Sequence, residues 1–410
     1  MRIGSILMAL VLLMNTAMAQ ELQQGPWFGN LARPDGQVIR FHFDVRMENR
    51  KTVLYIINAN ERIKMDKVRY TKDSVFFELP VFESAFKARR ISSQRWEGVW
   101  TKTTTAAPLV MPFVAETQMS VQSPALKPAV ADVTGRWAVT FTRENGTTRP
   151  AIGEWQQKGN TLRGTFLTPT GDYRYLSGVI DGDSMRLSTF DGVHVFLLTA
   201  KINNDRSVSG GTFYSGPTGK ETWQGTRNDT ATLPDVASMY FKDGDEKVNF
   251  RFRNLDKKWV SLDDPKFRNK VVVIQIMGSW CPNCMDETAF LSEYYNQNKA
   301  RGVEVIALAY EYSTDFDKAR QSIEKFRKRF NVKYSMLNTG VSVGDTLRTE
   351  KTLPQFTRIK SFPSTIILNK KHRVAAMKAG FEGPGTGEHY EAMKKEFEET
   401  IDKLLRPIKH

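Results

Sequence analysis

Residues 270–284 read KVVVIQIMGSWCPNC, and this stretch decides the fold of the C-terminal part of the chain. Residues 270–277 form a near-continuous apolar run, as expected for a strand that is buried on both faces of a sheet. The sequence predicts a helix from about Pro282 to Lys299, so Cys281 and Cys284 fall where the strand is followed by the helix. Cysteines three apart on a first helical turn share one face and can form a disulfide with little backbone movement.

The position of this pair predicts redox chemistry. Unpaired amides and the helix dipole at a helix N-terminus favour the thiolate of Cys281, and Pro282 fits there because its missing N–H costs nothing. Attack of Cys281 on a partner disulfide gives a mixed disulfide, which Cys284 resolves. These are the two cysteines of a 410-residue chain. A bridge over so small a loop adds little stability, which points to redox work.

Metal-binding alternatives have weaker support in the sequence. A zinc or haem site needs further ligands, and neither a second cysteine pair nor a histidine directly after Cys284 exists. We therefore expect a redox-active disulfide and no cofactor or metal. A protein that binds a ligand or partner, with a regulatory or copper-holding cysteine pair, stays open as the alternative. The histidines are scattered and are expected to be structural or exposed: His42, His194, His372, His389 and His410.

The rest of the C-terminal part predicts an α/β domain with helices over a central mixed sheet. The expected elements are strands at 303–308, near 334, at 364–368 and from 372 to 380, with helices at about 315–330 and 388–405.

Residues 20 to about 228 predict an all-β module, a sandwich or a barrel-like pair of sheets. Short runs rich in β-branched and aromatic residues alternate with turn residues, and helical periodicity is absent. A shift of 110 residues aligns Gly25 with Gly135, Trp27 with Trp137, and the Asp-Ser pair at 73–74 with that at 183–184, which suggests a duplication. The stretch 103–132 is predicted to be the seam between the two halves.

The N-terminus predicts export. Residues 1–19 combine a positive start, a short apolar run and a small-residue ending, as a signal peptide cleaved after Ala19 would. The apolar run is too short for a permanent membrane span, and no later segment approaches one. The sequence thus predicts a periplasmic protein. Its expected parts are β-rich subdomains at 20–130 and 131–230 and the α/β domain at 231–410.

The net charge of +14 raises the question of nucleic acid. Residues 1–230 hold 28 Lys and Arg against 21 Asp and Glu, and residues 231–410 hold 31 against 24, so each part carries +7. The excess is evenly spread and lacks a basic stripe interleaved with aromatic residues. We expect a solvated surface and no nucleic-acid partner; the oligomeric state is open.

A second motif lies before the strand at 364–368. Phe362-Pro363-Ser364 places a proline at a strand start, where the preceding peptide bond can be cis. With this motif, Trp280-Cys281-Pro282-Asn283-Cys284 and residues 305–308, the region 235–410 resembles the TlpA-like branch of the thioredoxin superfamily, thiol–disulfide oxidoreductases of bacterial envelopes.

The resemblance implies several roles. Cys281 is the attacking thiol, Cys284 the resolving thiol, and Pro363 the cis-proline that faces them. The backbone beside that proline pairs with a substrate chain as an added strand. Family members usually reduce protein disulfides, often in cytochrome c maturation, and receive electrons from a membrane thiol carrier.

Two positions qualify this resemblance. Gln275 stands where thioredoxin has a buried acid, and a glutamine cannot take up a proton. Glu287 matches an acid of the TlpA-like branch, and it is a candidate to tune Cys284; a solvated helix acid is the alternative. Three further segments resemble TlpA-like proteins with β-rich N-terminal extensions, and no chemistry is assigned to them: 171–176, 190–192 and 383–390.

Overall fold

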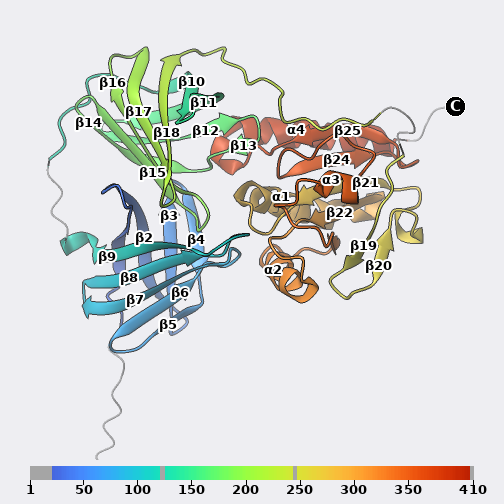
Figure 1. The fold of residues 1–410 in the computed structure, drawn as a ribbon, viewed down its shortest axis with the longest axis horizontal. Helices are drawn as coiled ribbons and strands as arrows, with labels where there is room; N and C mark the ends of the chain where they lie inside the picture. The colour runs from blue at the N-terminus through green and yellow to red at the C-terminus, as the bar shows by residue number, and fades with distance from the viewer. Residues whose placement is uncertain (1–20, 121–124, 243–246, 407–410) are drawn as a thin grey trace, which may run out of the picture.

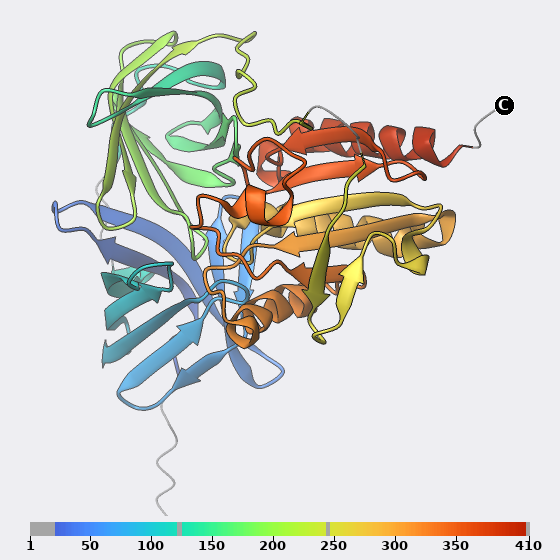
Figure 2. The ribbon, with the colours of Figure 1, turned by 45° about the vertical axis from the view of Figure 1, so that its right-hand side comes forward.

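The protein is described by a computed structural model of residues 21–120, 125–242 and 247–406. The predicted signal peptide, its cleavage after Ala19 and His410 lie outside these ranges. A β-rich part and an α/β part lie side by side (Figure 1). A rotated view shows that β strands of the first part reach the second (Figure 2). The predicted thioredoxin-like fold of the C-terminal region and the all-β region before it are both present.

The first half of the β module is a nine-stranded antiparallel sheet. Its order is β4-β3-β2-β1-β9-β8-β7-β6-β5, so the first and last strands pair in the middle and β4 and β5 are the edges. The strands are β1 (Gly25–Ala32), β2 (Val38–Glu48), β3 (Lys51–Asn58), β4 (Glu61–Met65), β5 (Val68–Tyr70), β6 (Ser74–Glu78), β7 (Ser84–Ser92), β8 (Arg95–Lys102) and β9 (Leu109–Thr117). The short helix η1 (Gln118–Ser120) follows.

The second half is a closed barrel. Its order is β11-β10-β18-β17-β16-β15-β14-β12-β13, and an additional pairing of β11 with β12 closes the ring. Closure removes the edge strands that the first sheet keeps. The strands are β10 (Gly135–Arg143), β11 (Thr148–Lys158), β12 (Thr161–Thr168), β13 (Gly171–Asp172), β14 (Leu176–Asp181), β15 (Ser184–Phe190), β16 (Val195–Ile202), β17 (Ser207–Ser215) and β18 (Gly219–Arg227).

The two halves share local features at the positions that the 110-residue shift aligns. Trp27 and Trp137 are both buried, and each indole N–H donates to the carbonyl four residues earlier, at 3.0 and 2.9 Å. Ser74 and Ser184 each begin a strand, β6 and β15. Because these pairs match in contact as well as in letter, they fit the hypothesis of a duplicated module.

The predicted seam at 103–132 is wrong in its first part. Strand β9 (Leu109–Thr117) lies within it and pairs with β1 and β8. Its alternate residues Met111, Phe113 and Ala115 are buried in the first core, which is the period-2 pattern of a strand. The Thr- and Pro-rich composition around it had obscured this pattern.

The C-terminal domain has a seven-stranded mixed sheet of order β20-β19-β23-β22-β21-β24-β25. Strands β21, β22 and β23 are parallel, and β24 and β25 continue the sheet antiparallel. The elements are β19 (Arg251–Asn254), β20 (Trp259–Ser261), η2 (Pro265–Phe267), β21 (Val271–Met277), α1 (Pro282–Asn298), η3 (Lys299–Arg301), β22 (Val303–Ala309), α2 (Phe316–Arg329), β23 (Ser335–Asn338), α3 (Arg348–Thr352), β24 (Ser364–Leu368), β25 (Val374–Ala379), η4 (Pro384–Thr386) and α4 (Glu388–Leu405).

The long elements of this domain lie within a few residues of their predicted bounds. The sequence missed the β19–β20 hairpin and α3, because elements of three to five residues carry too little periodicity to be recognised. All seven residues of β21 are buried, as the apolar run predicted. Its side chains therefore supply core on both faces of the sheet, and the cysteine pair is held at its C-terminal end.

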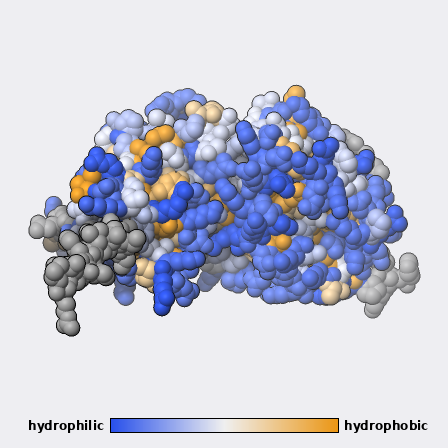
Figure 3. Space-filling model, turned by 90° about the horizontal axis from the view of Figure 1, so that it is seen from below, coloured by the Kyte–Doolittle hydropathy of each residue, from blue (hydrophilic) through white to orange (hydrophobic). Residues whose placement is uncertain are grey.

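The face in Figure 3 is mostly hydrophilic, with hydrophobic side chains scattered over it. Within residues 21–120, 125–242 and 247–406, no helix is long and apolar enough to cross a bilayer.

Candidate redox site

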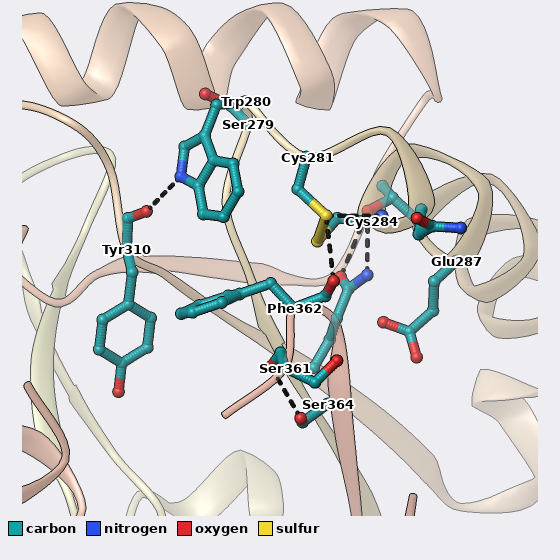
Figure 4. Close-up of a disulfide and its surroundings, with 12 residues drawn as sticks. Ser279, Trp280, Cys281, Cys284, Glu287, Tyr310, Ser361, Phe362 and Ser364 are labelled. Carbon is teal, nitrogen blue, oxygen red and sulfur yellow. Dashed lines mark hydrogen bonds between the residues drawn. A yellow bond between two sulfur atoms is a disulfide. The ribbon is translucent and has the colours of Figure 1, made fainter. Parts of the chain in front are cut away.

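The site is built where β21 ends and α1 begins. Cys281 is the N-cap of α1 in an extended conformation, and Pro282 is the first helical residue. Cys281 and Cys284 form a disulfide with their Cα atoms 5.2 Å apart. The structure thus brings the two cysteines together on the first turn, as the spacing predicted (Figure 4).

Two backbone groups lie at the sulfur of Cys281. The amide of Cys284 donates to Cys281 Sγ at 3.1 Å, and the carbonyl oxygen of Phe362 lies 3.4 Å from the same sulfur. The Phe362–Pro363 peptide bond is cis, as the resemblance led us to expect, and its carbonyl oxygen is the one that lies at Cys281 Sγ. An amide donor at a helix N-terminus stabilises negative charge on the atom that it faces, so the arrangement favours a thiolate at Cys281 after reduction.

Trp280 flanks the disulfide on the side of Cys281 (Figure 4). Its indole N–H donates to the carbonyl of Tyr310 at 2.8 Å, and its ring stacks on Tyr312 with centroids 5.6 Å apart. Next to it, the backbone N–H of Ser279 donates to buried Glu311 at 2.9 Å, and burial raises the pKa of Glu311 to about 7. These contacts fix the loop that precedes the cysteine pair, and no pattern in the sequence had pointed to Glu311.

Glu287 lies one turn beyond Cys284 on the opposite side from Trp280 (Figure 4). The side chain is buried, one carboxylate oxygen accepts from the hydroxyl of Thr365, and the other has no hydrogen-bond partner in the described part of the chain. Burial raises the pKa of Glu287 to about 7, although Thr365 and Gln275 oppose this rise. The alternative of a solvated helix acid is therefore wrong.

The surroundings of Glu287 are apolar. It lines a cavity of about 300 Å³ between α1, α4 and strands β24 and β25, with Phe290, Phe381 and Met393 among the other lining residues. Gln275 is fully buried, and its side-chain amide lies 3.1 Å from the hydroxyl of Thr288. Lys378 also lines this cavity and lowers the pKa of Glu287, but it forms no ion pair with Glu287 in the described part of the chain. A buried carboxyl group in such largely apolar surroundings exchanges protons near neutral pH.

Both cysteines of the pair are buried. Cys281, the expected attacking thiol, is only 4% exposed, and Cys284 is 0% exposed. Val81 and Phe82 of the β module belong to the same buried hydrophobic cluster as both cysteines, and Val193 packs against it. The β module therefore covers the redox centre, which no local pattern in the sequence indicated.

The sequence also missed a set of charged residues at this boundary. Arg174 of the β module is buried and hydrogen bonds to Asp286 of α1, two residues after Cys284. Segments 171–176 and 190–192 resemble TlpA-like proteins, and this resemblance was the signal in the sequence that could have found Arg174. Over the described residues, no group of three or more His, Cys, Asp or Glu is placed to hold a metal ion.

Comparisons with known proteins agree with the geometry. Residues 237–394 match the Redoxin family model. The thiol–disulfide oxidoreductase ResA of Bacillus thuringiensis subsp. konkukian is 28% identical over 132 residues, which are 32% of this chain and 66% of that protein. A ResA of Bacillus cereus is 33% identical over 91 residues, 22% of this chain and 48% of that protein. The chain thus matches less than two thirds of the length of these relatives.

The Redoxin match and the ResA relatives support a TlpA-like thiol–disulfide oxidoreductase of the thioredoxin superfamily in the C-terminal domain. The prediction of a TlpA-like thiol–disulfide oxidoreductase domain is thereby confirmed.

Two solved structures are similar to this TlpA-like domain. A thiol:disulfide interchange protein of the thioredoxin family from Chlorobium tepidum TLS is 14% identical, covering 39% of this chain and 95% of that chain, with a TM-score of 0.29. A DsbF homologue from Corynebacterium diphtheriae is 21% identical, covering 40% of this chain and 97% of that chain, with a TM-score of 0.29.

Proposed function

We propose that this protein is an exported enzyme of the bacterial envelope that exchanges disulfides with other proteins through Cys281 and Cys284. The observation that carries the proposal is the place of Cys281 Sγ, which caps α1 and accepts the amide hydrogen of Cys284 at 3.1 Å. A thiolate there is both stabilised and nucleophilic near neutral pH. The disulfide is the redox group, and the proposal needs no metal or other cofactor.

The exchange balances as two thiol–disulfide displacements. In the reduced protein, the Cys281 thiolate attacks one sulfur of a substrate disulfide, forming a mixed disulfide and releasing the first substrate thiolate. Cys284 then loses its proton and attacks Cys281 Sγ, which forms the intramolecular disulfide and releases the second thiolate. The substrate gains two electrons, and the protein is left in the disulfide form that the structure has.

Glu287 is proposed as the positioning acid for the second step. Cys284 is fully buried and needs a nearby group that takes its proton. Glu287 follows it on α1, and its pKa near 7 makes it both a proton acceptor and a proton donor at neutral pH. Pro363 is proposed to shape the substrate surface beside Cys281.

The direction of electron flow and the partners are also part of the proposal. ResA relatives carry the name thiol–disulfide oxidoreductase, and the TlpA-like resemblance favours a reductant. A reductant in the periplasm needs a supply of electrons, so we propose a membrane thiol carrier as donor and protein disulfides as acceptors, with cytochrome c maturation as the expected setting.

The test is reduction of insulin disulfides by dithiothreitol. The wild-type protein should accelerate the reaction, and Cys281→Ser should lose at least about a thousandfold of that acceleration, because the nucleophile is gone. Cys284→Ser should instead trap mixed disulfides with envelope proteins. Equal rates for wild type and Cys281→Ser would contradict the proposal. A measured reduction potential would then decide the direction of electron flow.

A further inference from the structure

Three segments with no assigned chemistry meet at one point of the structure. Residues 171–176 and 190–192 belong to the closed barrel, and 383–390 lead into α4 of the TlpA-like domain. A Cβ added to Gly385 would come within 2.8 Å of the backbone oxygen of Arg174, and one added to Gly383 within 2.7 Å of the carboxylate of Asp286. Gly385 thus permits a close approach of the two domains at Arg174, and Gly383 permits one of its own segment to Asp286.

Arg174 links three parts of the molecule. Its guanidinium donates to both carboxylate oxygens of Asp286 on α1, at 2.8 and 2.9 Å. It also donates to Asp191 after β15 at 3.1 Å, and to Glu61 at the start of β4 in the first sheet at 2.6 Å. All four side chains are at most 12% exposed. These residues, here called the Arg174 cluster, tie both halves of the β module to the helix that carries the cysteines.

A loop of the barrel lies on the redox centre. Residues 168–174, here called the capping loop, include the turn between β12 and β13. Asn283, between the two cysteines, donates its side-chain N–H to the carbonyl of Asp172 at 3.3 Å, and Gly383 N–H donates to the carboxylate of Asp172 at 2.9 Å. Gly171 has φ +139°, and a Cβ there would lie 3.0 Å from Asn283. The loop is therefore in direct contact with the cysteine motif.

The same loop contacts the segment before Pro363. The hydroxyl of Ser361 donates to the carbonyl of Thr170 at 3.1 Å. A Cβ added to Gly380, whose N–H donates to the carbonyl of Pro363, would lie 3.0 Å from the backbone of Thr170. An extended chain that pairs with this segment needs the space that the capping loop fills.

We propose that the β module closes the redox centre and that the Arg174 cluster holds it closed, so that a disulfide-bearing segment of a protein substrate reaches Cys281 when the capping loop moves away. The inference rests on the proposed function for the nature of the substrate. Opening replaces the contacts of the capping loop with contacts to the substrate chain. Because only the open protein binds, the apparent affinity for the substrate is the affinity of the open form multiplied by the fraction of protein that is open. A protein that makes few or poorly fitting contacts does not displace the capping loop. The closure therefore selects among substrates.

The test measures access to Cys281 without any enzymatic exchange. In the full-length Cys284→Ser background, which leaves a single thiol, the rate of modification by a polyethylene-glycol maleimide is divided by the rate with N-ethylmaleimide. Because both reagents share one chemistry, the ratio cancels changes in the thiol pKa. Glutathione gives the ratio for an open thiol, and the protein should give a ratio at least about tenfold lower.

Two variants of the cluster should raise this ratio. Asp286→Asn weakens a charge-assisted pair at the cysteine helix, and Glu61→Gln does so from the first sheet, far along the chain from the thiol. Each should raise the ratio on the order of tenfold, since a hydrogen bond to a charged group favours the closed form by that factor or more. Asp317→Asn, in an exposed pair with Lys257, is the matched control and should leave it unchanged. If Asp286→Asn fails to fold, judged by circular dichroism, Glu61→Gln decides.

The outcomes separate the closure from the proposed function. A wild-type ratio equal to that of glutathione, or an unchanged ratio in the folded cluster variants, would overturn the closure even if insulin is reduced. A ratio that rises in the variants supports the closure even if insulin is not reduced. In that case the proposed function is contradicted and the closure is not.

Discussion

The interior of the TlpA-like domain and its boundary with the β module bury acids in opposite ways. Asp286 and Glu287 are neighbours on α1 and both are buried. Asp286 faces the boundary, where the guanidinium of Arg174 holds it by two hydrogen bonds and opposes the rise of its pKa that burial causes. Glu287 faces the interior, where a hydroxyl is its hydrogen-bond partner and its pKa is raised to about 7.

This difference separates a structural charge from a proton-exchanging one. A cation that hydrogen bonds to a buried carboxylate favours its ionised form and joins the parts that the pair connects, whereas a buried carboxylate without an ion pair is more easily protonated near neutral pH. One helix therefore contributes Asp286 to the domain boundary and Glu287, the acid proposed to act on Cys284, to the interior. Three substitutions test this contrast.

The largest expected effect is that of Arg174→Met, which breaks the boundary side of the comparison. The carboxylates of Glu61 and Asp286 would stay buried without their cation, and removing one partner of such a cluster costs about 3–5 kcal/mol of the free energy of unfolding. Urea unfolding at neutral pH, followed by tryptophan fluorescence, measures the loss. An unchanged unfolding midpoint would mean that the cluster contributes nothing to holding the parts together.

Glu287→Gln tests the interior side through the pH dependence of stability. Because the folded pKa is about 7 and the ordinary value is 4.5, the folded state keeps its proton while the unfolded state loses it. Glu287 should therefore account for a fall of roughly 3 kcal/mol in the free energy of unfolding as the pH rises from 4.5 to 7, in addition to the fall that buried Glu311 causes in both proteins. The variant should lack the contribution of Glu287, and be more stable relative to the wild type at pH 8 than at pH 4 by that amount.

The same variant also reports on the thiol. In reduced protein, Glu287→Gln should lower the apparent pKa of Cys284, because the neighbouring negative charge is gone. Thiolate absorbance titrations give this pKa, and Glu293→Gln, an exposed acid of α1, is the control for a general charge effect. Titration curves that coincide for all three proteins would remove Glu287 from the proposed mechanism.

The smallest effect is expected where an acid is neither buried nor enclosed. Asp317→Asn removes an exposed pair with Lys257 at 3.2 Å, with both side chains more than half exposed. Water and salt screen such a pair, so the free energy of unfolding should change by no more than about 0.5 kcal/mol. A larger loss would show that burial is not what distinguishes the Arg174 cluster from ordinary surface pairs.

Prediction from the sequence succeeded where neighbouring residues determine the structure. The apolar run before Cys281 predicted a strand buried on both faces, and Pro282 and the cysteine spacing predicted the helix start, because hydrophobic period and capping act over a few residues. The halves of the β module followed from alternating strands in the same way, although the Thr- and Pro-rich composition around β9 hid that strand. The resemblance identified Glu287 as a candidate, but no pattern in the sequence indicated that its side chain is buried.

The sequence by itself therefore determined the redox pair, its place at the strand–helix junction and the fold class around it. The tertiary structure alone decided which charges meet. Arg174 lies 112 residues from Asp286 and 113 from Glu61 along the chain, and a charged residue in a loop ordinarily predicts a solvated surface. The cluster exists because the closed barrel turns the capping loop toward α1, and long-range packing of this kind leaves no periodic trace in the residues that it joins.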